Sequence, residues 1–194
     1  MEKKQIIKLI EEMALEKNIR LEDMPEIDLY MDQVIQLFES KYNDAKRNEE
    51  DKVLTKTMIN NYAKGKLLMP IKNKKYSKEH LILMSLIYNL KGSLSISDIK
   101  SSLDHIVKEF ENGSEYPLRE VYNAYLEQCE EDLDSFKKSV CDKDELVKNK
   151  VKNDKDKDFE EKFLLLCSMI NMSNMYRRMG EKIIDEFLTI EGGK

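Results

Sequence analysis

Residues 54 to 103 constrain the fold of this chain more than any other stretch, because they place two sets of helix signals around a basic loop. Thr55 is a favourable N-cap residue, since its hydroxyl can accept a hydrogen bond from a backbone N–H that has no partner inside the helix. Leu54 and Ile59 have the spacing of a hydrophobic staple around that cap. The pattern predicts a short helix that starts after Thr55 and ends at Gly65.

The two edges of this predicted helix differ in chemistry. One edge is apolar and carries Met58, Ile59 and Tyr62 at helical spacing. The other edge has lysine, amide and hydroxyl side chains and no acid: Lys56, Thr57, Asn60, Asn61 and Lys64. The pattern predicts a helix with one buried edge and one exposed, uncompensated basic edge.

A lysine-rich loop, residues 72–76, follows this helix, and Ser77 can then cap a second helix over residues 78–91. The second helix is apolar on most faces, which predicts that it forms the centre of the core. A polar helix edge beside a basic loop suits a nucleic-acid duplex, because amides can read base edges while lysines reach phosphates.

The charge distribution favours the same interpretation. The chain has a net charge of −5, yet residues 52–80 contain eight lysines and a single acid, Glu79, which gives this segment +7 and leaves −12 for the remainder. A segment almost free of acids in a chain that contains 38 of them is typical of a surface that meets a polyanion.

The order of these features resembles the winged helix-turn-helix of MerR-type regulators. The matching residues are Met58-Ile59-Asn60-Asn61-Tyr62, Lys66-Leu67-Leu68, Pro70, Tyr76-Ser77 and Ile96-Ser97-Asp98-Ile99. Together with Ile27-Asp28-Leu29-Tyr30-Met31-Asp32, they are more similar still to the bacterial family of domains of unknown function numbered 1836, which is regarded as a MerR-like DNA-binding group. The resemblance covers about residues 25 to 110.

This resemblance implies a mostly α-helical fold with a MerR-like winged helix-turn-helix head, which can include a small β wing, and double-stranded DNA as the partner. Asn60 and Asn61 stand where the MerR pattern has arginine and tyrosine. The DNA-binding residues that the residue pattern and the resemblance together predict are Lys56, Thr57, Asn60, Asn61, Tyr62, Lys64, Lys66, Lys72, Lys74, Lys75 and Tyr76.

Helical spacing divides the chain into three parts. Residues 1–24 contain an amphipathic helix over 2–16, and residues 25–112 form the predicted DNA-binding head, which starts with a helix over 27–42. Residues 113–194 form a helical C-terminal region for dimerisation or effector binding.

In that region we expect a helix over residues 117–140, a mobile charged connection over 142–158 and a last helix over 158–189. The last helix carries an apolar stripe in steps of four and three, the spacing of a coiled-coil seam. Its residues are Leu165, Met169, Met172, Tyr176, Met179 and Ile183. Packing within the chain and pairing in a homodimer explain this stripe about equally well.

Signals for catalysis or metal binding are weak. The sequence has no glycine-rich phosphate loop, no His-Glu-x-x-His and no nucleophile motif, and its two histidines and three cysteines lack ligand-like spacing. We therefore expect no enzyme activity, no metal and no cofactor. Cys129 and Cys167 lie on apolar stripes and are predicted core residues, whereas Cys141 is the expected exposed thiol.

The start of the chain carries no signal peptide, and its most apolar run, Leu81 to Leu90, is too short to span a bilayer, so we expect a cytoplasmic protein without a membrane partner. The predicted function is sequence-specific DNA binding as a non-catalytic transcriptional regulator. The alternative is a non-catalytic helical module that keeps the fold and binds protein. A small-molecule effector stays unknown, although Met169, Met172, Met175 and Met179 could line an apolar pocket for one.

Overall fold

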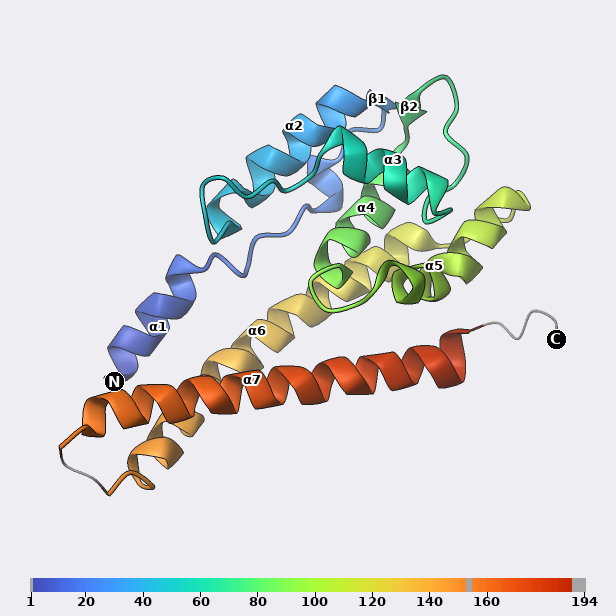
Figure 1. Cartoon of the computed structure of the whole chain (residues 1–194). Coiled ribbons are helices and arrows are strands. Elements are labelled where there is room, and N and C mark those ends of the chain that lie inside the picture. Colours follow the sequence, from blue (N-terminus) through green and yellow to red (C-terminus); the bar gives the residue numbers. More distant parts are fainter. Residues whose placement is uncertain (1, 153–154, 190–194) are drawn as a thin grey trace.

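The computed structural model describes residues 2–152 and 155–189, and most of them are helical (Figure 1). The helices are α1 (Lys3–Glu12), α2 (Met31–Tyr42), α3 (Lys56–Lys64), α4 (Lys78–Leu90), α5 (Ile96–Glu111), α6 (Leu118–Lys148) and α7 (Lys157–Ile183), and a π-helical turn (Ile184–Leu188) extends the last of them. Two short strands, β1 (Leu29–Tyr30) and β2 (Lys75–Tyr76), complete the fold. The predicted mostly α-helical class is confirmed.

Helix α4 lies at the centre of the larger hydrophobic core. Its residues Leu81, Ile82, Leu83 and Met84 have no exposed surface, which a helix can achieve only when it is apolar on most faces and covered on all sides. Residues from α2, α3, α5 and the start of α6 belong to the same buried cluster. The sequence-based expectation for this helix is confirmed.

The two strands join distant parts of the head. They pair antiparallel, with Leu29 opposite Tyr76 and Tyr30 opposite Lys75. This pairing ties the segment before α2 to the end of the basic loop between α3 and α4. The C-terminal end of this loop is therefore held in place by the pairing of β2 with β1.

The first turns of α6 pack into the head. Leu118 and Tyr122 are buried in the same cluster as α4, and the Tyr122 hydroxyl donates a hydrogen bond to the Ile19 carbonyl at 2.7 Å. Arg119 donates from Nη2 to Glu79 Oε1 at 2.8 Å and lies 3.2 Å from a carboxylate oxygen of Glu26. The domain boundary at residue 112 stays a prediction. The first turns of α6 follow that boundary, yet they are buried in the core formed mainly by residues that precede it.

Helix α6 is longer than predicted. Residues 142–148, which we expected to be part of a mobile connection, are its last two turns, because α1 covers that end of the helix. Ile6 and Ile10 of α1 form a second buried cluster with Val140 and Cys141 of α6. Residues 153–154 of the predicted connection lie outside the described residues.

The same packing corrects the predicted positions of the cysteines. Cys141, the expected exposed thiol, is buried against α1, whereas Cys167, an expected core residue, is exposed on α7 and Cys129 is half-buried. Helix α7 runs back along α6, and its π-helical end contacts α5 (Figure 1). Across the described part of the chain, no helix has both the length and the apolar character that crossing a bilayer requires.

Candidate nucleic-acid interface

Helix α3 is held by the signals that the sequence contains. The Thr55 hydroxyl accepts a hydrogen bond from the Met58 backbone N–H at 3.1 Å, as an N-cap does. Leu54 and Ile59 are both buried, in keeping with a hydrophobic staple across the cap. These contacts fix the direction in which α3 leaves the core.

The polar edge of α3 is exposed over its full length. Its residues recur at positions i, i+1 and i+4, so they share one side of the helix. All five predicted side chains of this edge are exposed: Lys56, Thr57, Asn60, Asn61 and Lys64. In Figure 1, α3 and the loop that follows it lie on the opposite side of the molecule from α7.

A tight turn at the end of α3 presents one more lysine. The N–H groups of Leu67 and Lys66 donate to the carbonyls of Tyr62 at 3.0 Å and Ala63 at 3.1 Å, which is the hydrogen-bond pattern of a Schellman motif. An added Cβ at Gly65 would lie 2.6 Å from Leu67 Cδ1, so a larger residue there would require the Leu67 side chain to move. Lys66 occupies the left-handed position of the motif, at φ +58°, where glycine is the usual residue.

The basic loop ends in a two-residue hairpin turn. The Lys75 N–H donates to the Lys72 carbonyl at 2.9 Å, and the two residues between them, Asn73 and Lys74, have φ values of +51° and +57°. Positive φ at both central residues is the hallmark of a type I′ turn. Lys72 and Lys74 are exposed at its tip, whereas the half-buried Lys75 places its Nζ 5.1 Å from the ring centre of Tyr30.

His80 ties the two ends of this loop together. Its Nδ1 accepts a hydrogen bond from the Ser77 backbone N–H at 3.1 Å, so the proton is on Nε2, which donates to the Met69 carbonyl at 3.2 Å. The imidazole is buried, and this burial lowers the pKa of His80 from its ordinary value of 6.5. One neutral side chain thus holds Met69 before the loop and Ser77 after it.

We expect the stability of the head to depend on this histidine in mildly acidic solution. Because the folded-state pKa of His80 is lowered, the unfolded chain binds the proton more readily, and the neutral form's contribution is present in full only above about pH 6.5. That contribution is lost as the pH falls from about 6.5 through the folded-state pKa, by at most ~1.4 kcal/mol per pH unit. Carboxylates titrate mainly below this window.

Denaturant unfolding of the wild type at several pH values tests this expectation, with His80→Gln as the comparison. Glutamine keeps a neutral donor and acceptor but does not titrate, so the variant should lose less free energy of unfolding between neutral and mildly acidic pH. Parallel curves for the two proteins would show that His80 is not the group responsible.

The lysines of the segment 52–80 differ in their ion pairs. Lys56 lies 2.7 Å from Asp32, with both side chains exposed, and the buried Lys78 pairs with Glu26. Within residues 2–152 and 155–189, no carboxylate forms an ion pair with the four remaining exposed lysines of the interface, Lys64, Lys66, Lys72 and Lys74. Their charge is therefore left to solvent or to a partner.

Two predicted contact residues do not lie on the surface. Tyr62 and Tyr76 are both buried in the hydrophobic core, Tyr62 on the apolar edge of α3 and Tyr76 in β2 facing His80 edge-on. Their side chains pack in the core beneath the exposed residues of the interface. The exposed aromatic ring beside the loop is Tyr30 of β1, which the sequence did not indicate as a site residue.

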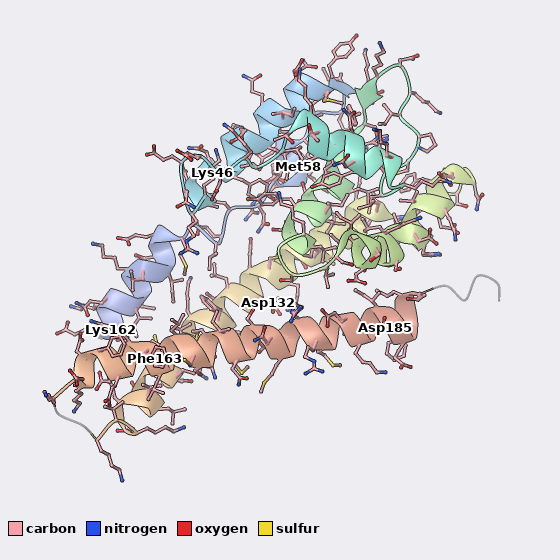
Figure 2. The ribbon with its side chains drawn as sticks, in the orientation of Figure 1. Lys46, Met58, Asp132, Lys162, Phe163 and Asp185 are labelled. Atoms are coloured by element: carbon pink, nitrogen blue, oxygen red, sulfur yellow. The ribbon has the colours of Figure 1, made fainter. Side chains whose placement is uncertain are left out.

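The residues of the predicted dimer seam on α7 differ in their exposure to solvent. Leu165 is buried, and Met169 packs against the cluster that α1 and α6 form, so the first part of the stripe faces the same chain. Tyr176, Met179 and Ile183 are exposed. Figure 2 shows many α7 side chains that project from the ribbon into solvent.

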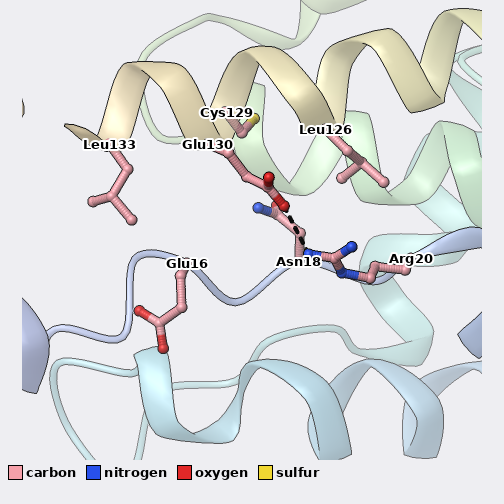
Figure 3. A pocket seen from close by; sticks show the side chains of 7 residues that line it. All are labelled: Glu16, Asn18, Arg20, Leu126, Cys129, Glu130 and Leu133. Atoms are coloured by element: carbon pink, nitrogen blue, oxygen red, sulfur yellow. Dashed lines mark hydrogen bonds and ion pairs between the residues drawn. The ribbon is translucent and has the colours of Figure 1, made fainter. Parts of the chain in front are cut away.

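The structure has hollows of about 30 Å³ and about 270 Å³, and neither is lined by a residue of α3. One is a cavity of about 30 Å³, room for about one water molecule. It lies between α6 and the segment after α1, where Arg20 and Glu130 are 2.7 Å apart (Figure 3). A second hollow lies between α1 and the end of α6. None of the four methionines considered for an effector pocket lines either of them.

Comparison with known proteins places the chain in a family. A family model described as a domain of unknown function, DUF1836, matches residues 19–125. No curated protein and no solved structure matches. The matched segment is more than half of the chain and contains β1, β2, α2 to α5 and the part of α6 that enters the core. On that match, the chain belongs to the family of domains of unknown function DUF1836.

Proposed function

We propose that this protein is a non-catalytic, sequence-specific DNA-binding regulator of transcription that works in the cytoplasm as a homodimer. In this proposal, α2 and α3 act as a MerR-like helix-turn-helix and the loop 66–77 acts as its wing. The connection between the two helices, residues 43–55, is long for such a motif and contains a 3₁₀ turn, Asn43–Ala45. A surface insertion of this length costs little, because loop-closure entropy grows slowly with length.

The observation that carries the proposal is the group of four lysines without carboxylate partners in the described residues, beside two exposed asparagines. Lys64 and Lys66 lie at the end of α3, and Lys72 and Lys74 lie at the tip of the following turn. Lysines neutralise phosphates and release their counterions, which supplies affinity without sequence preference. Asn60 and Asn61, about one turn before Lys64 on α3, are exposed, and an asparagine can pair with the N6 and N7 positions of adenine.

Binding to genomic DNA fragments at two salt concentrations tests the proposal directly. We expect retarded complexes in a gel-shift assay, with an affinity that falls steeply as salt rises. Selection of a recurring sequence from the bound fragments would support specific recognition. A protein that binds no duplex at low salt would rule out DNA binding as its function.

Sequence discrimination is expected to depend on Asn60 and Asn61. Alanine at either position should cost about 1–3 kcal/mol of preference at one base position, because a bidentate pair with adenine is lost. Affinity for unrelated duplexes should change little, since neither residue carries charge. Binding to the selected site and to single-base variants of it, measured by fluorescence anisotropy, gives both quantities.

Asn171→Ala is the matched control, because Asn171 is exposed on α7, on the opposite side of the molecule from α3. If both asparagine variants lose specific and non-specific affinity in equal measure, these residues contact the DNA backbone or support the fold, and base reading is located elsewhere.

A protein partner at the same face is the second candidate function. Ile27 is 71% exposed and Tyr30 is 55% exposed, and both precede α2 next to the anchored end of the loop. Exposed apolar side chains beside a charged surface are also found where proteins bind one another. A protein that fails the gel-shift assay and still needs Ile27 and Tyr30 for its function in cells would favour this candidate.

A further inference from the structure

The chain just before α3 is held through the backbone of Val53, which comes shortly before the N-cap residue Thr55. The Val53 N–H donates a hydrogen bond to Glu39 Oε1 of α2 at 3.4 Å, and the Val53 carbonyl accepts one from Lys91 Nζ at 3.0 Å. Lys91 directly follows the last residue of α4, and Val53 is buried in the larger core. We name Glu39, Val53 and Lys91 the Val53 clamp.

Lys91 gives up contact with water to bind Val53. A lysine at the end of a helix usually extends its amino group into solvent near the last carbonyls. Lys91 is instead half-buried, with Nζ 4.5 Å from the ring centre of Tyr88, and this burial lowers the pKa of Lys91 from its ordinary value of 10.5. Across the described residues, no carboxylate forms an ion pair with Lys91. The Val53 carbonyl and the Tyr88 ring are therefore the groups that compensate its charge.

Glu39 closes the long connection between α2 and α3 at its base. Besides the Val53 N–H, its carboxylate binds Lys46, whose Nζ lies 2.7 Å from Glu39 Oε2. The hydrogen bond from Lys46 is the main cause that lowers the pKa of Glu39. Residues 47–52, which lie between the two partners of Glu39, are all exposed. The constraint on α3 therefore acts at Val53 and does not depend on the exposed part of the connection.

We propose that Glu39 and Lys91 are positioning residues for base reading, because they fix the direction of α3 through Val53. This inference rests on the proposed DNA binding and adds to it the residues that orient Asn60 and Asn61. Helix α3 has nine residues, fewer than an isolated helix needs to be stable in water, so its direction depends on contacts with the core. A side chain that reads a base must be held within about 0.5 Å of its productive position.

A general contribution to stability would have different consequences. Residues at the centre of the core, such as Leu81 and Met84, pack among several helices, and their loss would weaken every element at once. The Val53 clamp acts on one segment of backbone through two hydrogen bonds. Its loss should free the start of α3 and leave α4 and α5 in place.

Amide hydrogen exchange without DNA tests the clamp itself. Lys91→Met keeps the length of the side chain but removes its donor. The amides of Val53, Met58 and Ile59 should exchange about tenfold to hundredfold faster, as the loss of a hydrogen bond from a charged group predicts, while the amides of α4 keep their protection. Lys91→Arg keeps a charged donor and should retain the wild-type rates. Lys138→Met removes a charge from an exposed position on α6 and is the matched control.

DNA binding tests the consequence for base reading. In Lys91→Met, the ratio of the affinities for a selected site and for an unrelated duplex should fall about fivefold to 150-fold, the effect of one lost adenine pair. Affinity for the unrelated duplex should match that of Lys138→Met, because both variants lose one positive charge. Glu39→Leu should lower the ratio in the same way, whereas Glu39→Gln keeps an acceptor for the Val53 N–H and should stay near the wild type. Thermal unfolding must show that each variant is folded at the temperature of the assay.

Three results would overturn the proposal. Unchanged exchange at Val53, Met58 and Ile59 in Lys91→Met removes the clamp, and an equal acceleration throughout α4 shows a general loss of stability instead. If exchange changes as expected but the ratio of affinities stays at the wild-type value, the clamp does not position the reading side chains. A wild type that binds no duplex would remove the proposed regulator, and the exchange rates alone would then decide whether Glu39 and Lys91 fix α3.

Discussion

Glutamine at Lys72, Lys74 and Lys75 is expected to weaken binding to every duplex by about 500-fold at ~0.1 M salt, if each lysine meets one phosphate. The plot of affinity against salt should also become less steep, by about one unit for each lysine lost. The effect should be the same for specific and unrelated sequences, because phosphate contacts carry no base information. Fluorescence anisotropy over a range of salt concentrations measures both the affinity and the slope.

The matched control removes the same charge from a distant surface. Lys3, Lys4 and Lys17 are exposed near the start of the chain, and glutamine at all three should change binding only slightly. The wing variant also loses the contact of Lys75 with Tyr30, worth about 0.5–1 kcal/mol at an exposed site, so its thermal unfolding must be compared with the wild type. If the folded wing variant binds DNA as tightly as the control, the loop is not part of the interface.

The local signals around α3 were sufficient to predict its ends. The cap at Thr55, the staple of Leu54 and Ile59 and the stop at Gly65 all act between residues close in sequence, and the structure contains each of them. Helix α4 was equally clear, because a helix that is apolar on most faces can only be stable when it is surrounded.

Tyr62 shows how two lines of sequence evidence can disagree. Its helical spacing with Met58 and Ile59 indicated the buried edge of α3, whereas the family resemblance indicated a DNA contact, and the predicted site followed the resemblance. The structure buries this side chain. Spacing reports the physical environment of this residue in this chain, and a resemblance reports what a position does in other proteins.

The length of α6 and the packing of α7 could not be predicted from the sequence, because both depend on contacts between residues far apart in the chain. Residues 142–148 are highly charged and favoured a frayed segment, but α1 covers that end of α6 and keeps it helical. Nothing in the spacing of α1 or α6 identifies the other as its partner. Helix α7 posed the same difficulty, because the spacing of its stripe from Leu165 to Ile183 fits packing within the chain and pairing between two chains equally well.

Lys66 and Lys74 stand at positions where the backbone favours glycine. Both have positive φ, at +58° and +57°, and both are exposed. The left-handed conformation costs an ordinary residue about 1–2 kcal/mol. Residues that break a local rule in this way are often found where function requires their side chains. We infer that these two lysines are kept for their charge.

Replacing both with glycine should therefore change stability and binding in opposite directions. The free energy of unfolding should rise by about 0.5–1 kcal/mol at each position, because relief of the left-handed conformation is partly offset by the greater freedom of glycine in the unfolded chain. Affinity for DNA should fall about 60-fold at ~0.1 M salt, as expected when two phosphate contacts are lost. Denaturant unfolding and anisotropy measure the two effects on the same protein.

Lys64→Gly is the control that removes a lysine charge without relieving a left-handed backbone conformation. Lys64 is exposed in the last turn of α3 and has a helical backbone, so glycine there removes a charge and lowers stability, by up to about 1 kcal/mol. Its affinity should fall about eightfold at ~0.1 M salt if it meets one phosphate. A glycine pair at Lys66 and Lys74 that is more stable and yet binds DNA as well as the wild type would show that these lysines serve no contact with the duplex. If these lysines form a DNA-binding surface, the variant with glycine at Lys66 and Lys74 should be more stable than the wild type and bind DNA more weakly. A loss of folding could then not explain its loss of affinity.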